Sequence, residues 1–304
     1  MPSLSRRRVC ACRFVLLGSR SVISQRNDNG VEVRKHESPP KSFDPPPWPS
    51  ATDPLGSPLG SSFLEQDPER LPEKPLGRIT TIRESDPAAL ADRLCQDLRD
   101  HLQPEDLVCI PTGRSPELLY RLVENDPVSI RLWQQLRYLQ LDEYIFPPSG
   151  IESFRESLHR QVFEPLEISP DRIHSIEATT DPEAETKRLD TLFDEIGPPR
   201  AVILGLGSNG HIAFNEPCDA PRSGYHVVDL SPMTIHDNFP EAAHEKIRAI
   251  TIGLDQLQRS ERIYLLVPQQ EKAQILDRCL AGPHDPQIPA SMLHEHPDLH
   301  VYRY

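Results

Sequence analysis

Along residues 78–304, short apolar runs alternate with longer segments in which apolar residues recur every three or four positions. The apolar runs predict strands at 107–110, 136–141, 201–205, 248–252, 262–267 and 300–304. The periodic segments predict helices at 86–102, 116–124, 151–165, 181–196 and 270–280, with a short helix near residue 254. We therefore predict a Rossmann-like α/β fold, with a doubly wound, mostly parallel sheet and helices on both faces.

The first 77 residues lack this periodicity. Residues 1–75 hold 12 of the 33 prolines, and such a segment buries too little apolar surface to offset its ordering entropy. We therefore predict two regions: a disordered Pro-rich extension at 1–77 and a single domain at 78–304. Residues 1–27 contain six arginines and no acidic residue, a composition that fits either a targeting peptide or a plain tail.

The overall charge and the cysteines narrow the class of protein. A formal net charge of −13 and a pI near 5.4 argue against a general affinity for nucleic acid or for an anionic membrane. The chain has no run of 18 apolar residues, so we expect no membrane span. The six cysteines show no spacing typical of a metal site; they indicate free thiols in a reducing compartment and favour a cytoplasmic location.

The most informative segment is GLGSNGHIAFNEP at 205–217, directly after the strand predicted at 201–205. Its glycines permit a tight turn at the carboxyl end of that strand, where open α/β sheets bind ligands. A lone histidine is more often an ordinary loop residue. His211, however, shares this turn with Asn209 and Glu216, and a carboxylate can orient and tune an imidazole, which favours a catalytic role. The match to G-x-G-x-x-G is not a nucleotide fingerprint, because His211 stands where a helix should pack.

Two further segments follow predicted strands. PTGRSP at 111–116 reads as a strand-to-helix turn, with Ser115 as the N-cap and Pro116 as the first helical residue. Its free N–H groups suit an anion, although an ordinary turn gives the same pattern. Asp142 and Glu143 come at the carboxyl end of the strand at 136–141, where a partly desolvated carboxylate serves as a general base or simply belongs to an acidic turn.

Together, GLGSNGHIAFNEP, PTGRSP and LQLDEY at 139–144 resemble the glucosamine-6-phosphate deaminase/isomerase family over roughly residues 78–304. The resemblance implies an enzyme that opens the ring of an amino-sugar 6-phosphate, moves a proton between C2 and C1, and releases ammonia to give fructose 6-phosphate. It implies no metal and no other cofactor. The expected partner is a small-molecule sugar phosphate, and a homo-oligomer remains open.

The resemblance also implies roles for individual residues. His211 would assist ring opening, with Glu216 orienting it, and Asp142 rather than Glu143 would carry the proton between the carbons. Asn209 would complete the catalytic group. The phosphate would be bound by Thr112, Gly113, Arg114, Ser115 and Lys272.

Two departures from the family leave the substrate open. Asn209 stands where the family usually has an aspartate, and no arginine occupies the family's phosphate-binding position after Pro217. Compensating groups for that arginine are Arg114, Arg222, His226 and Lys246. The alternatives are a galactosamine-6-phosphate deaminase/isomerase, a 6-phosphogluconolactonase-like hydrolase and a non-catalytic sugar-phosphate sensor. FNEP at 214–217 and LDEY at 141–144 favour the deaminase/isomerase over the lactonase.

Overall fold

The computed structural model describes residues 23–26, 32–35, 78–147, 150–177, 181–242 and 246–304. The chain divides into two units, Met1–Pro68 and Glu69–Tyr304. In the first unit, β1 (Ile23–Arg26) and β2 (Glu32–Lys35) pair antiparallel, which the sequence pattern did not indicate. The other residues of 1–77, on which the prediction of a disordered extension depends, lie outside the described residues.

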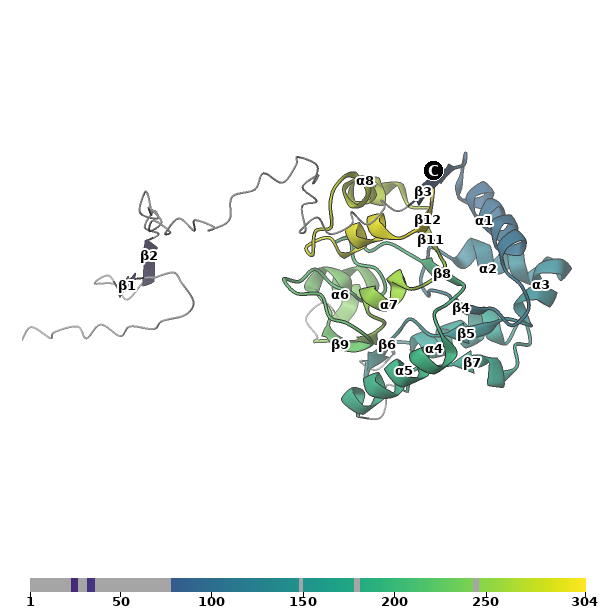
Figure 1. Ribbon diagram of the computed structural model, residues 1–304, viewed down its shortest axis with the longest axis horizontal. Coiled ribbons are helices and arrows are strands. Elements are labelled where there is room, and N and C mark those ends of the chain that lie inside the picture. The colour runs from purple at the N-terminus through teal and green to yellow at the C-terminus, as the bar shows by residue number, and fades with distance from the viewer. Residues whose placement is uncertain (1–22, 27–31, 36–77, 148–149, 178–180, 243–245) are drawn as a thin grey trace, which may run out of the picture. The chain divides into compact units, whose positions relative to one another are not determined.

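A seven-stranded parallel sheet forms the centre of the second unit (Figure 1). Its strands, in spatial order, are β3 (Arg78–Arg83), β12 (Asp298–Arg303), β11 (Arg262–Val267), β8 (Ala201–Leu204), β4 (Leu107–Cys109), β5 (Arg137–Leu139) and β7 (Ile173–His174). Every pair of neighbours is parallel. The prediction of a mostly parallel, doubly wound sheet is confirmed.

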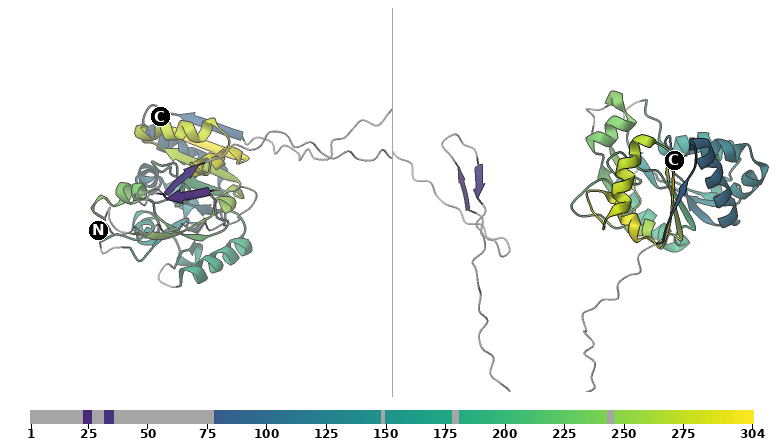
Figure 2. Two further views of the ribbon diagram at one scale, coloured as in Figure 1. Left: turned by 90° about the vertical axis from the view of Figure 1, so that its left-hand side faces the viewer. Right: turned by 90° about the horizontal axis from the view of Figure 1, so that it is seen from above.

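Helices cover both faces of this sheet, because its strands are apolar on both sides. In β8, Val202 and Leu204 point into one core while Ala201 and Ile203 point into the other. The second of these cores packs against α1 (Pro87–His101), α2 (Glu117–Glu124), α3 (Pro127–Trp133), α4 (Phe154–Leu158) and η1 (His159–Phe163). The first packs against α5 (Pro182–Ile196), α7 (Leu254–Gln258), α8 (Ala273–Ala281) and η5 (Pro289–Glu295). Figure 2 (right) shows blue α1 and yellow α8 on opposite sides of the sheet.

A second, three-stranded antiparallel sheet lies beside the first. It consists of β6 (Asp142–Ile145), β10 (Arg248–Thr251) and β9 (His226–Asp229), in that order. The predicted strand at 136–141 is therefore too long: β5 ends at Leu139, and Asp142 begins a strand of another sheet. Periodicity does not reveal this change of sheet, because the apolar run continues across Leu141 while the strand partner changes.

Helix starts follow their capping residues. Asp86, Asp126, Asp181 and Ser231 accept backbone N–H groups at the starts of α1, α3, α5 and α6 (Pro232–Asn238), and each is followed by proline. The prediction that Ser115 caps α2 is wrong: the N-cap is Pro116, with no side-chain cap. The helix predicted at 151–165 is a five-residue α4 followed by the π-helical turn η1. Three short 3₁₀ segments complete the described elements: η2 (Pro170–Arg172), η3 (Pro240–Ala242) and η4 (Gln270–Lys272).

The order of the strands determines where a ligand can bind. From β4 the chain moves to β5 and β7 on one side, then returns to β8 on the other side of β4 and continues to β11 and β12. The side on which successive strands are added therefore changes between β4 and β8. These two strands pair in parallel, Val108 with Ala201 and Cys109 with Val202. Ligands of open α/β sheets bind at such a reversal, outside the carboxyl ends of the strands.

Removing residues 1–75 should leave the second unit folded. Its cores draw their described members from residue 79 onward, and Glu69–Tyr304 forms a compact unit by itself. We expect the midpoint of thermal unfolding and the near-UV circular dichroism of the shortened chain to match those of the full chain. A clear fall in that midpoint would mean that the first unit stabilises the second.

Candidate active site

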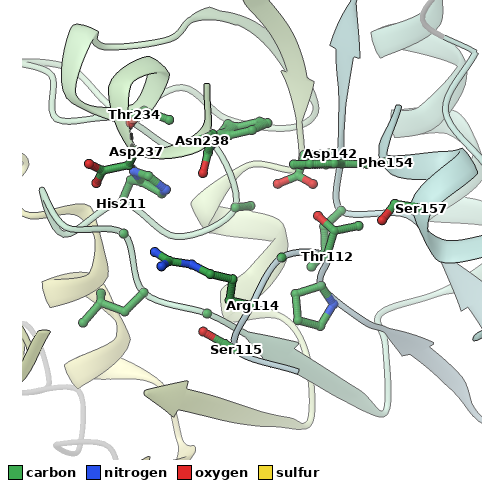
Figure 3. A pocket seen from close by; sticks show the side chains of 18 of the residues that line it. Thr112, Arg114, Ser115, Asp142, Phe154, Ser157, His211, Thr234, Asp237 and Asn238 are labelled. Atoms are coloured by element: carbon green, nitrogen blue, oxygen red, sulfur yellow. Dashed lines mark hydrogen bonds between the residues drawn. The ribbon is translucent and has the colours of Figure 1, made fainter. Parts of the chain in front are cut away.

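A cavity of about 530 Å³ opens at the carboxyl ends of β4 and β8 (Figure 3). Its walls include most of the residues singled out from the sequence: Thr112, Gly113, Arg114, Ser115, Asp142, His211 and Lys272. Asn209 and Glu216 do not line the cavity; they lie behind His211 and contact it from the protein side. The three predicted segments therefore meet at one place.

The glycines of the 205–217 turn have separate roles. Gly210 has a φ of 85°, a left-handed conformation that favours glycine. Gly207 instead gives room to the imidazole: a Cβ placed there would lie 2.3–2.5 Å from ring atoms of His211. The turn therefore depends on one glycine for its backbone path and on another for the position of its histidine.

Asn209 is the residue that holds His211. Its Oδ1 lies 2.7 Å from Nδ1 of His211 and also accepts the backbone N–H of His211 at 3.1 Å. Its Nδ2 donates to Oε2 of Glu216 at 2.7 Å and to Oγ of Ser231 at 3.2 Å. The hydroxyl of Thr234 lies 3.2 Å from the same ring nitrogen, as the dashed line in Figure 3 shows.

Glu216 acts on His211 indirectly, through Asn209. Its Oε2 is 3.9 Å from Nδ1 of His211, beyond hydrogen-bond range, and Asn209 bridges the two. Its other oxygen accepts the backbone N–H of Ser231, the N-cap of α6. The resemblance implied that Glu216 orients His211, and the geometry provides that orientation through Asn209.

The pKa of His211 is lowered from its ordinary value. Burial disfavours the charged ring and is the largest cause; the positive charge of Lys272 acts in the same direction, and the negative charge of Glu216 opposes both. The imidazole is therefore neutral near pH 7 and available as a proton acceptor.

The remaining residues of the FNEP segment fasten the turn to the rest of the molecule. Phe214 stacks on Phe154 and packs against Tyr144 of β6, in a third hydrophobic cluster separate from the two cores of the parallel sheet. Asn215 donates to the backbone oxygens of Ile212 and Ile252. The backbone N–H of Phe214 donates to the hydroxyl of Thr251 in β10, so FNEP supports His211 both through Glu216 and through this anchoring.

Asp142 is a buried carboxylate whose pKa burial raises to about 8, with a smaller contribution from the charge of Glu143. It lines the cavity, and the described residues provide no hydrogen bond to its carboxylate (Figure 3). A desolvated carboxylate without a donor is a stronger base than an ordinary surface aspartate.

Glu143 differs from its neighbour. Its two oxygens accept the backbone N–H groups of Tyr144, Phe154 and Arg155 at 2.8–2.9 Å and the amide of Gln140 at 3.1 Å. Phe154 and Arg155 are the first residues of α4. Glu143 therefore fixes the start of that helix to β6. Four hydrogen bonds occupy its two carboxylate oxygens, so neither is available to accept a proton from a substrate.

Positive charge in the cavity comes from Arg114, Arg160 and Lys272. Lys272 is largely buried and donates to the backbone oxygen of Leu206 at 2.5 Å, and burial followed by the charge of Arg114 lowers its pKa. It is therefore not a solvated surface lysine. Of the four groups suggested as substitutes for the missing arginine, Arg114 lines the cavity, whereas Arg222, His226 and Lys246 do not.

Arg160, Gln269 and Thr234 line the cavity but were not anticipated from the sequence. Arg160 forms a two-bonded ion pair with Glu152 at 2.7–2.9 Å, and Ser115 exchanges hydrogen bonds with Gln269 instead of capping α2. Thr234 belongs to α6, whose start carries the pattern Ser231-Pro232. That cap-and-proline pair was the available signal for α6.

Within the part of the chain that the structure describes, no group of three His, Cys, Asp or Glu residues has a metal-binding arrangement. Among the same residues, no helix combines the length and apolar character needed to cross a bilayer.

The chain is similar to known proteins over most of its second unit. The model of the family described as glucosamine-6-phosphate isomerases/6-phosphogluconolactonase matches residues 83–301. A glucosamine-6-phosphate deaminase of Lachnoclostridium phytofermentans is 32% identical over 206 residues, which are 66% of this chain and 87% of that protein. Glucosamine-6-phosphate deaminase 1 of Giardia intestinalis is 31% identical over 229 residues, which are 72% of this chain and 84% of that protein.

Solved structures show the same fold. A monomeric glucosamine-6-phosphate deaminase superposes with a TM-score of 0.69 at 29% identity, covering 74% of this chain and 96% of its own. The 6-phosphogluconolactonase of Trypanosoma brucei has a TM-score of 0.58 at 18% identity, covering 75% and 96%, and supports the fold alone. The chain belongs to the family of glucosamine-6-phosphate isomerases and 6-phosphogluconolactonases.

Proposed function

We propose that this protein is an amino-sugar-phosphate deaminase/isomerase that converts glucosamine 6-phosphate to fructose 6-phosphate and ammonia. One observation carries the proposal: a buried, unpartnered Asp142 and a neutral His211 face the same cavity, beside the cations Arg114 and Lys272. The similarity to glucosamine-6-phosphate deaminases supports this substrate.

His211 serves the first step, the opening of the sugar ring. Its unprotonated ring nitrogen accepts the proton of the C1 hydroxyl and returns it to the ring oxygen as the bond between C1 and that oxygen breaks. The product is the open-chain aldehyde. A neutral imidazole suits both transfers, since it accepts and then donates one proton.

Asp142 serves the second step. Its carboxylate removes the proton from C2 while O1 of the aldehyde takes a proton from the substrate's own ammonium group, which gives an enolamine. Delivery of the C2 proton to C1 then leaves a hydroxymethyl group at C1 and an iminium at C2. Addition of water to C2 and departure of ammonia then give the ketose. Burial raises the pKa of Asp142 to about 8, which strengthens it as a base and places its titration near the working range.

The phosphate end of the substrate belongs at the 111–116 turn. The turn leads into α2, whose N-terminus has no side-chain cap and so keeps its N–H groups available to an anion. Arg114 and Lys272 line the cavity near this turn. An acidic protein thus binds an anion through local amides and two cations. We expect the protein to act in the cytoplasm, where sugar phosphates are retained.

The direct test measures ammonia and fructose 6-phosphate from glucosamine 6-phosphate and galactosamine 6-phosphate side by side, with hydrolysis of 6-phosphogluconolactone as the third reaction. We expect product from glucosamine 6-phosphate. Lactone hydrolysis alone would overturn the proposal in favour of the hydrolase, product from galactosamine 6-phosphate alone would correct the substrate, and binding without turnover would indicate a sensor.

Replacing the proposed base should remove turnover. Asp142→Asn keeps the shape of the side chain and loses the proton acceptor, so kcat should fall by about 10²–10⁴-fold. For the unmodified protein, kcat/KM should rise with pH up to about 8, because Asp142 must lose its proton to act. Asp194→Asn, at an exposed position on α5, is the matched control. Near-normal exchange of the C2 proton with solvent in Asp142→Asn would exclude this base.

The same substitution should stabilise the fold. Between about pH 4 and 8 the native Asp142 holds a proton that the unfolded chain has released, so its contribution to stability falls as pH rises. Asp142→Asn has no such loss, and its melting temperature should exceed that of the unmodified protein at pH 8 by about 2–4 °C for each 1 kcal/mol gained. The gain should shrink toward pH 4. An equal gain at both pH values would mean that titration is not its cause.

Removing the lysine should weaken binding more than chemistry. A charged hydrogen bond is worth roughly 1.5–3 kcal/mol, so Lys272→Ala should raise KM by about 10–100-fold. Phosphate contacts persist from ground state to transition state, and kcat should change far less. Lys187→Ala, on the exposed face of α5, controls for the loss of one positive charge. An unchanged KM for Lys272→Ala would remove Lys272 from the phosphate site.

Gly207 should tolerate no side chain. In Gly207→Ala the new methyl group would lie within 2.5 Å of the His211 ring, which must move aside. A misplacement of about 1 Å costs roughly 100-fold in rate, so kcat should fall by that order while the fold persists. Gly282→Ala, with nothing within 4 Å of the new methyl group, is the control. Normal kcat in Gly207→Ala would show that the ring position is not critical.

A further inference from the structure

The side chain of Asn209 can face only one way in this structure. Its two ends meet groups of opposite character: one meets the carboxylate of Glu216, which only accepts, and the other meets the backbone N–H of His211, which only donates. A reversed amide would set oxygen against oxygen at Glu216 and N–H against N–H at His211. Glu216 therefore determines that the oxygen of Asn209 points toward the histidine.

An amide oxygen has no hydrogen to give. Because Oδ1 of Asn209 lies 2.7 Å from Nδ1 of His211, that ring nitrogen must carry the proton and donate it. The other ring nitrogen, Nε2, then holds the lone pair of the neutral imidazole. Nε2 has no hydrogen-bond partner in the described part of the chain, and His211 lines the cavity.

We propose that Asn209 is a positioning residue: its amide, aligned by Glu216, holds the proton of His211 on Nδ1 and presents the Nε2 lone pair to the substrate. The geometry alone supports the position of the proton, and its use in ring opening rests on the proposed function. The simpler alternative is that Asn209 only shapes the turn, through the bond from the His211 backbone N–H two residues on.

A neutral amide also limits the charge near the ring. The charged groups that face His211 are Glu216 and Asp237, which favour imidazolium, and Lys272, which opposes it, while burial disfavours the charge most. Asn209 contributes no charge at 2.7 Å, so the balance remains on the neutral side. The imidazole thus stays a base at a lower pH than an ordinary histidine does.

An aspartate at this position would change that balance. Two carboxylates would then meet where the amide now bonds Glu216 at 2.7 Å, and they would share one proton because both cannot ionise at that separation. The remaining negative charge would lie in part directly against Nδ1 of His211, closer than the 3.9 Å at which Glu216 now stands. Imidazolium would be favoured.

The test reads the ring nitrogens directly. The full chain, labelled with ¹⁵N-histidine, is followed by two-bond ¹H–¹⁵N correlation across pH 4.5–9 without substrate, with His211→Gln assigning the His211 signals. Asn209→Asp and Glu216→Gln are compared with the unmodified protein. Asn125→Asp adds the same charge at the end of α2 and serves as the matched control.

We expect the unmodified protein to show a protonated Nδ1 and a bare Nε2, with a titration midpoint below that of an ordinary histidine. In Asn209→Asp the midpoint should rise by about one pH unit or more. Glu216→Gln should lower the midpoint and mix the two tautomers. Asn125→Asp should change neither.

A proton found on Nε2 in the unmodified protein would overturn the proposal. So would an Asn209→Asp variant whose midpoint and tautomer equal those of the unmodified protein, since a residue that only shapes the turn gives that result. The tautomer is read without substrate, so absence of ammonia release alongside the expected tautomer would count against the proposed function and leave this inference standing.

Discussion

The parallel pairing of β4 with β8 is the constraint on which the rest of the site depends. β4 and β8 are neighbours at the point where the strand order changes direction, and the chain continues from their carboxyl ends into the 111–116 turn and the 205–217 turn. The two turns therefore lie side by side although about ninety residues separate them in sequence. β5 lies next to β4 and delivers Asp142 to the same edge. The 111–116 turn, the imidazole of His211 and the carboxylate of Asp142 therefore meet because of the strand order.

Burial gives these groups their chemistry. The same low-polarity surroundings raise the pKa of Asp142 to about 8 and lower that of His211, so that one becomes a stronger base and the other stays neutral. Its neighbour Glu143 instead accepts four hydrogen bonds, and the two from Phe154 and Arg155 fasten β6 to the start of α4. One member of the acidic pair is thus structural, and the other is left free.

Much of the fold and part of the site follow from sequence patterns. The long amphipathic helices α1 and α5 and the buried strands β8 and β11 have strong periodicity, and their predicted positions agree with the structure to within about two residues. The short elements α3, α6, β7 and β9 were missed, because a few residues give no clear period. The second sheet was missed because its strands pair across long sequence separations.

The site shows the same division. The segments that follow strands, with His211 and Asp142, are readable because strand ends bring polar residues together. The position of Asn209 between Glu216 and His211 is not readable, since the direction of an amide depends on partners that only the folded turn provides. The same holds for Ser115, whose partner Gln269 is 154 residues away.

Asn209 and Gly210 also form the dipeptide most prone to spontaneous loss of the side-chain amide, a reaction that begins when the following backbone nitrogen attacks the amide carbon. In the folded turn that nitrogen belongs to Gly210 and donates to the backbone oxygen of Gly207 at 3.0 Å, while hydrogen bonds hold both ends of the Asn209 amide. The contacts that orient His211 therefore also protect Asn209 from deamidation. Protein held unfolded loses this protection and accumulates aspartate and isoaspartate at the position that supports its imidazole.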